Sequence, residues 1–323
     1  MSVKLNKKFN ILIIIVGIIT VIISTIYNQK KDEEENKIEE SNKNYFKNYM
    51  NNIEENNDKI NSFFEEANAN INLISDEPYV LEGFKYKEGE KNSGFVIEDD
   101  FENQYVWIPA TVDDDNNYIK LQRADFDFAQ SPIIDECLET SKDMKSFIES
   151  IKKYKGYYVA RYEASKSENG EIISKPNEKP ITKLTKETAE NLSENIYSDS
   201  KIKTSLMNSY AWDTMVKWIE QTNNNKEFLT TYEEDEEKND INANSSIKIL
   251  NLKVKNTGEE KVNNIYDIYG NVAEITTEMC EETMVVRSAV DSEKKHIDMT
   301  SRILKLNNSD NEDTGFRIIL YKE

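Results

Sequence analysis

The first long hydrophobic run of the chain lies near its N-terminus. From Ile11 to Tyr27 no residue is charged, and a helix over this run is about 25 Å long, because each residue adds about 1.5 Å. This is slightly short of the ~30 Å hydrocarbon core of a bilayer, but flanking asparagines and snorkelling lysines can make up the difference. The pattern predicts a transmembrane helix over residues 10–28, after a short cytoplasmic tail of residues 1–9.

The charges on either side of this span bear on its orientation. Three lysines, Lys4, Lys7 and Lys8, precede it, while Lys30 and Lys31 are followed directly by acidic residues. The positive-inside rule therefore favours a cytoplasmic N-terminus. A cleaved signal peptide is the alternative, but no small-residue cleavage site and no lipobox cysteine follow the run. We expect an uncleaved signal anchor that places a single-pass protein in the cell membrane, with its C-terminal domain extracytoplasmic.

Residues 29–77 are expected to form a helical stalk or linker, since they contain neither proline nor glycine. Hydrophobic positions recur there at spacings of four and three, with one polar member, and this seam consists of Phe46, Met50, Ile53, Asn57, Ile60, Phe64, Ala67 and Ile71. Such a seam is typical of a coiled coil, which would give a homodimer. A single amphipathic helix lying on the globular domain, or a frayed linker, explains the same pattern.

Beyond Pro78 the pattern changes to short strands and turns. Residues 105–110, YVWIPA, alternate and predict a strand that stops at Pro109. Residues 156–165, GYYVARYEAS, predict a second strand, with alternate residues from Tyr157 on one face and alternate residues from Tyr158 on the other.

Two helices and several strands are predicted in the rest of the chain. A helix over 185–197 has Thr185 as its cap, and a helix over 209–221 carries a one-sided hydrophobic stripe, typical of core packing, at Trp212, Met215, Val216 and Ile219. Residues 223–246 read as an acidic, solvated insertion. Strands return in IYDIYG, in 283–290 and in 314–323. This mixed order predicts the α+β class.

Composition narrows the chemistry. The net charge of -20 argues against a nucleic-acid partner, because phosphates require a basic surface. A Cys/His zinc site is excluded by ligand count, since the chain has two cysteines and one histidine, His296, which we interpret as a solvated loop residue. Cys137 and Cys280 could form a disulfide in an extracytoplasmic domain, but the sequence leaves their pairing open.

The order of these segments resembles the formylglycine-generating enzyme (sulfatase-modifying factor) superfamily, a branch of the C-type-lectin-like fold. The family's segments GFYIGRYEVT, RLPTEAEWEYA, NVYDMAGNVWEWT, VLRGGSW and GFRVV are similar, in the same order, to GYYVARYEAS, SLMNSYAWDTMV, NIYDIYGNVAEIT, VVRSAVD and TGFRIIL. The resemblance covers about residues 78–323 and implies a sulfatase-modifying-factor-like domain there.

The resemblance also implies a calcium loop in NIYDIYGNVAEI. Matched position by position, Asp267 and Glu274 would donate carboxylate oxygens, and Gly270 and Val272 would donate backbone carbonyls. Hard oxygen ligands around a tight glycine turn suit calcium. Such a calcium ion would be structural. The alternative is that Asp267 caps a turn and Glu274 is a solvated strand residue.

The catalytic chemistry of the family is not expected here. Its oxidases bind copper through two cysteines after the RGGS strand, and the matching stretch of this chain, DSEKKHIDMTSRILKLNNSDNEDTGFR, has no cysteine. We therefore expect no copper and no formylglycine-generating activity. The favoured function is a membrane-anchored extracytoplasmic binding or scaffold module for an unknown ligand or protein. An enzyme of different chemistry in the same superfamily, and a purely structural envelope protein, are the alternatives.

Overall fold

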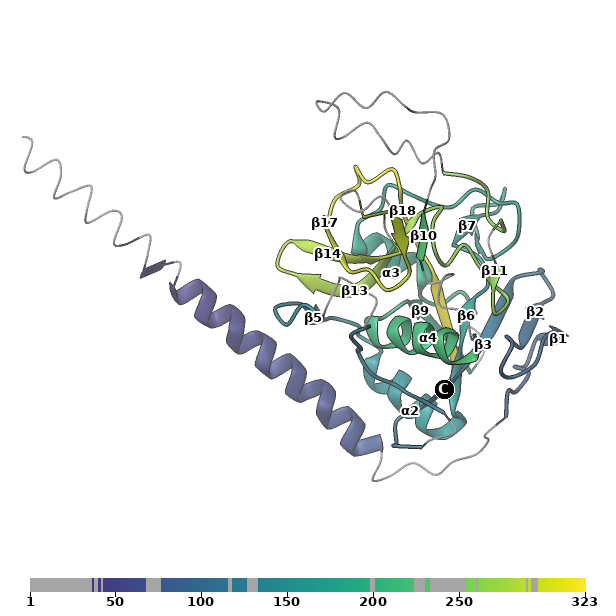
Figure 1. The fold of residues 1–323 in the computed structure, drawn as a ribbon, viewed down its shortest axis with the longest axis horizontal. Coiled ribbons are helices and arrows are strands. Elements are labelled where there is room, and N and C mark those ends of the chain that lie inside the picture. The colour runs from purple at the N-terminus through teal and green to yellow at the C-terminus, as the bar shows by residue number, and fades with distance from the viewer. Residues whose placement is uncertain are drawn as a thin grey trace, which may run out of the picture. The chain divides into compact units, whose positions relative to one another are not determined.

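A computed structural model gives the fold (Figure 1). The residues that it describes are 37, 40–41, 43–67, 77–115, 118–126, 133–197, 201–223, 230–232, 254–259, 261–288, 290–291 and 296–323. The predicted tail 1–9, the transmembrane span 10–28 and most of the predicted insertion 223–246 lie outside them. Within the described part, no helix combines the length and the hydrophobicity needed to cross a bilayer.

The chain divides into two compact units, residues 1–55 and residues 56–323. Helical structure over residues 43–67 contributes to both units. In the first unit, Tyr45, Phe46 and Met50 expose their side chains. The globular unit thus begins at residue 56, whereas the sequence predicted a domain starting at residue 78.

Residues 56–67 pack on the globular unit as an amphipathic helix. Ile60 and Ala67 are buried in its main core, and the ring of Phe64 lies 5.9 Å from that of Tyr210. Asn57, the polar member of the predicted seam, is exposed. Over these residues the helix behaves as the predicted alternative to a coiled coil, because the hydrophobic seam that a second copy would need faces the domain.

The main sheet has seven strands in the order β1-β2-β3-β6-β19-β9, with β4 beside β3. All neighbours are antiparallel except β3 and β4. Its strands are β1 (Phe84–Glu88), β2 (Val96–Asp99), β3 (Gln104–Thr111), β4 (Ile119–Lys120), β6 (Gly156–Ala160), β9 (Ile202–Leu206) and β19 (Ile318–Lys322). The last strand in chain order, β19, therefore lies between β6 and β9.

A second sheet of five strands has the order β17-β14-β13-β18, with β5 beside β13. It consists of β5 (Leu138–Glu139), β13 (Ala273–Cys280), β14 (Thr283–Arg287), β17 (Ile303–Leu306) and β18 (Thr314–Phe316). Small ribbons complete the described strands: β7 (Ser165–Lys166) with β8 (Ile172–Ile173), β11 (Lys261–Val262) with β12 (Ile265–Tyr266), and β16 (His296–Asp298) between β10 (Thr230–Tyr232) and β15 (Val290–Asp291). His296 thus lies in a strand and not in a loop.

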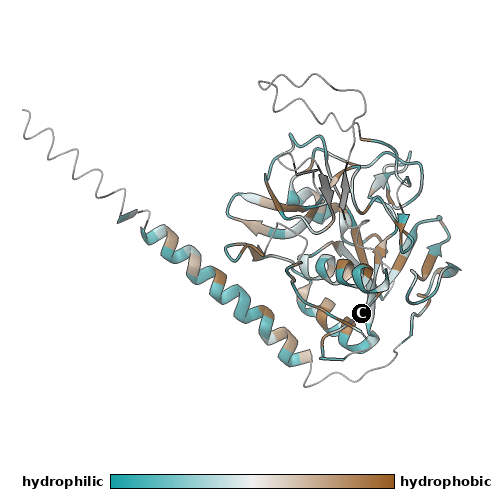
Figure 2. Ribbon diagram, viewed as in Figure 1, coloured by the Kyte–Doolittle hydropathy of each residue, from teal (hydrophilic) through white to brown (hydrophobic). Residues whose placement is uncertain are grey.

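Three helices join the sheets: α2 (Met144–Tyr154), α3 (Lys186–Ser193) and α4 (Ser209–Thr222). Thr185 caps α3 as predicted, because its side chain accepts from the backbone N–H of Thr188. Helix α3 ends at Ser193, short of the predicted residue 197. In α4 the predicted stripe is fully buried, and hydrophobic colour runs along this helix in Figure 2.

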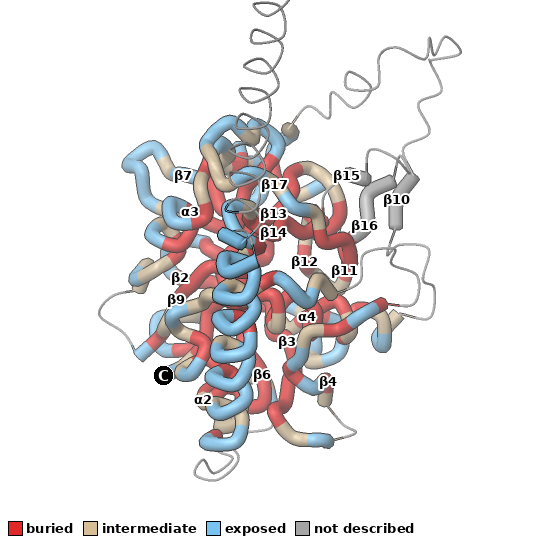
Figure 3. The backbone as a smooth tube through the Cα atoms, turned by 90° about the vertical axis from the view of Figure 1, so that its left-hand side faces the viewer, coloured by how far each residue is buried: buried red, intermediate tan, exposed pale blue. Residues whose placement is uncertain are grey.

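Both faces of the main sheet are covered, each by its own hydrophobic core. Tyr157 and Val159 belong to the core that includes the buried faces of α2 and α4, while Tyr158 and Ala160 belong to the core that includes residues of α3, β13 and β14. The predicted alternation in β6 is therefore confirmed, with both faces buried (Figure 3). The predicted α+β class, built mainly from antiparallel sheets, is also confirmed.

Strand β3 continues through Pro109 to Thr111, so the prediction that it stops at Pro109 is wrong. The N–H of Trp107 donates to Phe95 on the β2 side, whereas the N–H of Ala110 donates to Lys155 on the β6 side. Because backbone N–H groups alternate along a strand, the nitrogen of Pro109 faces the β2 side, where pairing with β2 has ended. Proline is tolerated there because no hydrogen bond is lost.

Cys137 and Cys280 form a disulfide that links positions 143 residues apart. Cys280 ends β13, and Cys137 immediately precedes β5, the strand that pairs with it. Val285 packs beside the two sulfurs, and Ile134 covers them partly. The pairing that the sequence left open is therefore present in the structure.

Candidate functional site

The segment NIYDIYGNVAEI begins in β12, turns sharply and enters β13. Asp267, Gly270 and Asn271 all have positive φ, at 55°, 102° and 56°. The value at Gly270 lies in a region that L-residues rarely adopt, so this turn depends on glycine, as the sequence indicated. The turn brings Asp267 and Glu274 into a buried group with Arg317, Glu163 and Asn271, which we call the Arg317 cluster.

Arg317 holds Glu274 through both carboxylate oxygens. Its Nε lies 3.0 and 3.1 Å from the two oxygens, and its Nη2 lies 2.7 Å from Oε1. The remaining donors of Arg317 bond to the carbonyl oxygens of Ala160 and Tyr266. Both side chains are fully buried. Charge-assisted, two-pronged contacts of this kind are among the strongest that a carboxylate makes in a protein.

Asp267, which follows β12, bonds to the backbone of the segment before β11. Its carboxylate accepts from the N–H of Gly258 and, at 3.1 Å, from the N–H of Glu259. Its side chain thus links the two ends of the β11–β12 hairpin. Glu274 is not the solvated strand residue of the alternative to a calcium loop, because its side chain is fully buried.

Glu163, like Arg317, is a member of this cluster that sequence reasoning missed. It follows β6 in the segment RYEAS, is fully buried, and accepts from the side chain of Asn271 and from the N–H of Val272 at 3.2 Å. Burial raises the pKa of its carboxyl well above the usual value, Arg317 opposes the shift, and the charges of Glu274 and Asp267 add to it. The one sequence signal was its place in a segment that resembles the family.

The cluster holds three buried carboxyl groups, Glu163, Asp267 and Glu274, around Arg317. One guanidinium does not balance the two fully buried carboxyl groups of Glu163 and Glu274 in ionised form at low dielectric, so a proton on Glu163 or a further cation is needed. The predicted four-residue ligand set fits calcium poorly, because Arg317 already occupies both oxygens of Glu274 and a second cation there would be repelled. Among the described residues, no group of three acidic, histidine or cysteine side chains is arranged to hold a metal ion.

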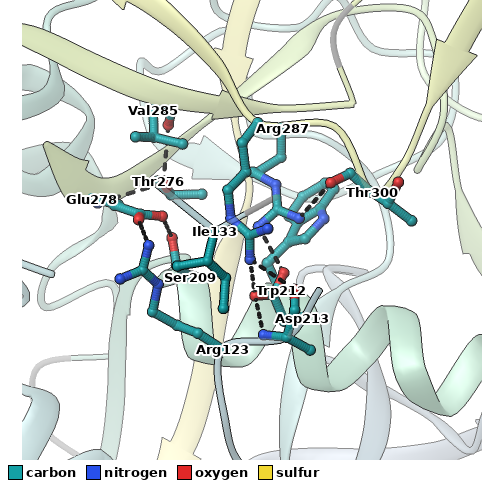
Figure 4. A network of polar contacts seen from close by, with 12 residues as sticks. Arg123, Ile133, Ser209, Trp212, Asp213, Thr276, Glu278, Val285, Arg287 and Thr300 are labelled. Atoms are coloured by element: carbon teal, nitrogen blue, oxygen red, sulfur yellow. Dashed lines mark hydrogen bonds and ion pairs between the residues drawn. The ribbon is translucent and has the colours of Figure 1, made fainter. Parts of the chain in front are cut away.

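A second buried polar group lies where the start of α4 meets β13 and β14 (Figure 4). It contains Arg123, Ser209, Asp213, Glu278, Arg287 and Arg302, and we call it the Asp213 network. Asp213 accepts from Arg287 at 2.8 Å, from the N–H of Ala124 at 2.9 Å, and from Arg302. The side chains of Asp213, Arg287 and Arg302 are fully buried.

Glu278 makes the other half of the Asp213 network. Its two carboxylate oxygens accept from Arg123 and from the hydroxyl of Ser209. Trp212 closes the group, since its indole N–H donates to the carbonyl of Met299 at 2.7 Å and the guanidinium of Arg287 lies 5.5 Å from its ring. Each of the two acids in the network, Asp213 and Glu278, is paired with at least one of its three arginines, as buried charges require.

Comparisons with known proteins add nothing to these geometries. No protein-family model, no curated protein and no solved structure matches the chain.

Proposed function

We propose that the chain is a membrane-anchored extracytoplasmic binding or scaffold module, built on a non-catalytic domain of the formylglycine-generating-enzyme type with a C-type-lectin-like fold. The observation that carries this proposal is that four charged residues of the resembling segments, Asp213 with Arg287 and Glu274 with Arg317, pair with one another inside the domain. They have structural partners and do not face a substrate.

All five resembling segments contribute to these two buried groups, and GYYVARYEAS does so through Glu163. Asp213 of SLMNSYAWDTMV pairs with Arg287 of VVRSAVD, and Glu274 of NIYDIYGNVAEIT pairs with Arg317 of TGFRIIL. Segments that share a fold with a known family should place their matching charges in contact, because buried charges require partners. The two ion pairs thus support the resemblance on grounds independent of the letters of the sequence.

The cysteines support the non-catalytic half of the proposal. Copper(I) in the family's oxidases needs thiolates, whereas Cys137 and Cys280 of this chain are joined to each other. A disulfide sulfur has no thiolate to offer a metal or a substrate. The disulfide also supports an extracytoplasmic domain, since such bonds persist in oxidising compartments.

Calcium stays a prediction from the resemblance. The surplus of buried carboxyl groups in the Arg317 cluster favours a cation, while the contacts of Glu274 with Arg317 favour protonation of Glu163 instead. We propose protonation as the main source of neutrality. Addition of calcium or of a chelator would then leave the melting temperature of the purified chain unchanged.

The decisive experiment measures the metal content of the purified full chain and its activity on a cysteine-containing peptide, with copper supplied. We expect no stoichiometric copper or iron and no aldehyde product by mass spectrometry. Copper bound one-to-one together with aldehyde formation would overturn the non-catalytic assignment. Stoichiometric calcium that is lost in the Asp267→Ala variant would instead restore the calcium loop and leave the scaffold proposal intact.

A further inference from the structure

The Cys137–Cys280 disulfide lies at the edge of a very short strand. Strand β5 has two residues, and its register pairs Glu139 with Glu278 and Leu138 with Met279. Continuing this register places Cys137 opposite Cys280. Among the described strands β5 pairs with β13 alone, so the disulfide reinforces a pairing that is only two residues long.

Strand β5 also holds the helix over residues 56–67. The side chain of Asn56 donates to the backbone carbonyl of Glu139 at 3.1 Å. The carboxylate of Glu139 accepts from the N–H of Ser209 at 2.9 Å, at the first turn of α4. The next residue of that turn, Tyr210, packs against Phe64 of the helix. Glu139 therefore connects the two elements that the helix contacts here, β5 through Asn56 and the first turn of α4 through Phe64.

The contacts of Glu139 depend on the pairing of β5 with β13. Glu139 is buried, and its carboxyl group lies beside the charge of Glu278. Two neighbouring carboxyl groups in a buried site repel each other. The hydroxyl of Thr277 and the N–H groups of Ser141 and Ser209 hold Glu139 in place. If β5 separates from β13, the carboxylate of Glu139 loses its hydrogen bond from the hydroxyl of Thr277. Solvation by water is then more favourable for this carboxylate than burial.

We propose that the Cys137–Cys280 disulfide is a redox-sensitive latch, which keeps β5 on β13 and thereby keeps the helix over residues 56–67 docked on the domain. Its reductant is a dithiol, either a small molecule or a dithiol protein. A thiolate of the reductant attacks Cys280, which is 7% exposed whereas Cys137 is 1% exposed. Cys137 leaves as a thiolate and takes a proton, and the second thiol of the reductant then releases Cys280, so that two electrons are transferred and the reductant becomes a disulfide.

The latch acts at the point where the helix over residues 56–67 contacts β5. Reduction would free this helix from β5 while the strands of the main sheet stay paired, because no strand of that sheet contains a cysteine. The inference does not depend on the proposed binding function, since it concerns only how the helix is held.

The test is hydrogen exchange of the full chain in detergent, oxidised and after treatment with dithiothreitol, beside a Cys137→Ala, Cys280→Ala double variant. We expect exchange of the amides in 58–67 and in the first turn of α4 to become about tenfold faster in both the reduced chain and the double variant, the factor expected for the loss of one hydrogen bond. Amides of β3 and β6 should keep their protection.

The matched control is Asn56→Ala, which removes the hydrogen bond between the helix and Glu139 and leaves the disulfide in place. It should speed exchange in 58–67 without any change at α4. The latch is refuted by unchanged exchange in 58–67 after reduction, by an equal acceleration in β3 and β6, or by a disulfide that dithiothreitol does not reduce while the chain is folded.

Discussion

At the scale of single residues, the buried carboxyl group of Glu163 lies in surroundings that disfavour its ionised form. Burial and the charges of Glu274 and Asp267 raise its pKa above the ordinary 4.5. A carboxyl group with a raised folded-state pKa stabilises the fold fully below its unfolded-state pKa, and this contribution is lost as the pH rises through the folded-state value.

The Glu163→Gln variant should therefore flatten the pH dependence of stability. Glutamine keeps the shape of the protonated side chain and cannot ionise, so the variant should lose less stability than the wild type as the pH is raised from about 4.5. Urea denaturation at a series of pH values measures this. Parallel stability curves for the two proteins would show that Glu163 is ionised throughout, as it would be beside a bound cation.

Asp213 is the residue whose loss should cost most, because it faces both Arg287 and Arg302 in a site without solvent. Asp213→Ala leaves two buried guanidinium groups short of a partner, and we expect the free energy of unfolding to fall by about 3–5 kcal/mol. If this variant does not fold, Arg302→Met gives a milder test, because it keeps the contact between Asp213 and Arg287.

Lys183→Ala is the matched control for the Asp213 variant. Its ion pair with Glu312 is exposed, with 56% and 77% of the two side chains accessible, and the urea midpoint should stay unchanged. Equal losses in Asp213→Ala and Lys183→Ala would contradict the structural role of the Asp213 network.

At the scale of elements, residues 56–67 could belong either to a coiled-coil stalk or to the domain, and mutations distinguish the two. Ile60 is 4% exposed within the main core, whereas Asn57, one turn earlier, is exposed. Ile60→Ala should cost about 2–5 kcal/mol of stability, since it leaves a cavity. Asn57→Ala should change neither stability nor mass in sedimentation. A change of oligomeric state in Asn57→Ala would instead indicate a coiled coil with Asn57 in its seam.

Most of these elements could be predicted from local pattern. The stripe of α4 and the alternation of β6 follow from the periods of helices and strands, and Thr185 follows from capping chemistry. The continuation of β3 through Pro109 could not be predicted from local pattern. A strand tolerates proline where the pairing with its neighbour has ended, and that position is a property of the sheet. The docking of Ile60 could not be predicted, since the same spacing serves a helix partner and a domain surface equally well.

The candidate site was predictable only in part, because some of its contacts join residues that are far apart along the chain. The turn at Gly270 is local, and its glycine and acids can be read from the sequence. Arg317 lies 43 residues from Glu274 along the chain, and Glu163 lies 109 residues from Val272. Which basic residue pairs with which acid depends on strand order, so the pairing of Glu274 with Arg317 could not be predicted from the sequence.

At the scale of the whole molecule, the topology of the proposed membrane anchor can be tested directly. Protease added to intact cells that make the full chain should remove the domain, if residues 10–28 anchor it with the domain outside. A tag fused before residue 1 should stay protected inside. Complete protection of the domain, with cleavage only after the cells are broken, would reverse this orientation.

The place of β19 has a consequence for how the molecule is made. This strand, Ile318–Lys322, separates β6 from β9 in the main sheet, and Arg317 immediately precedes it. While the chain is being synthesised, β6 and β9 therefore have no partner between them and Glu274 has no counter-charge. The main sheet can close only after β19 has been added, so a domain that is translocated during synthesis crosses unfolded and gains its sheet and its buried ion pair in one late step.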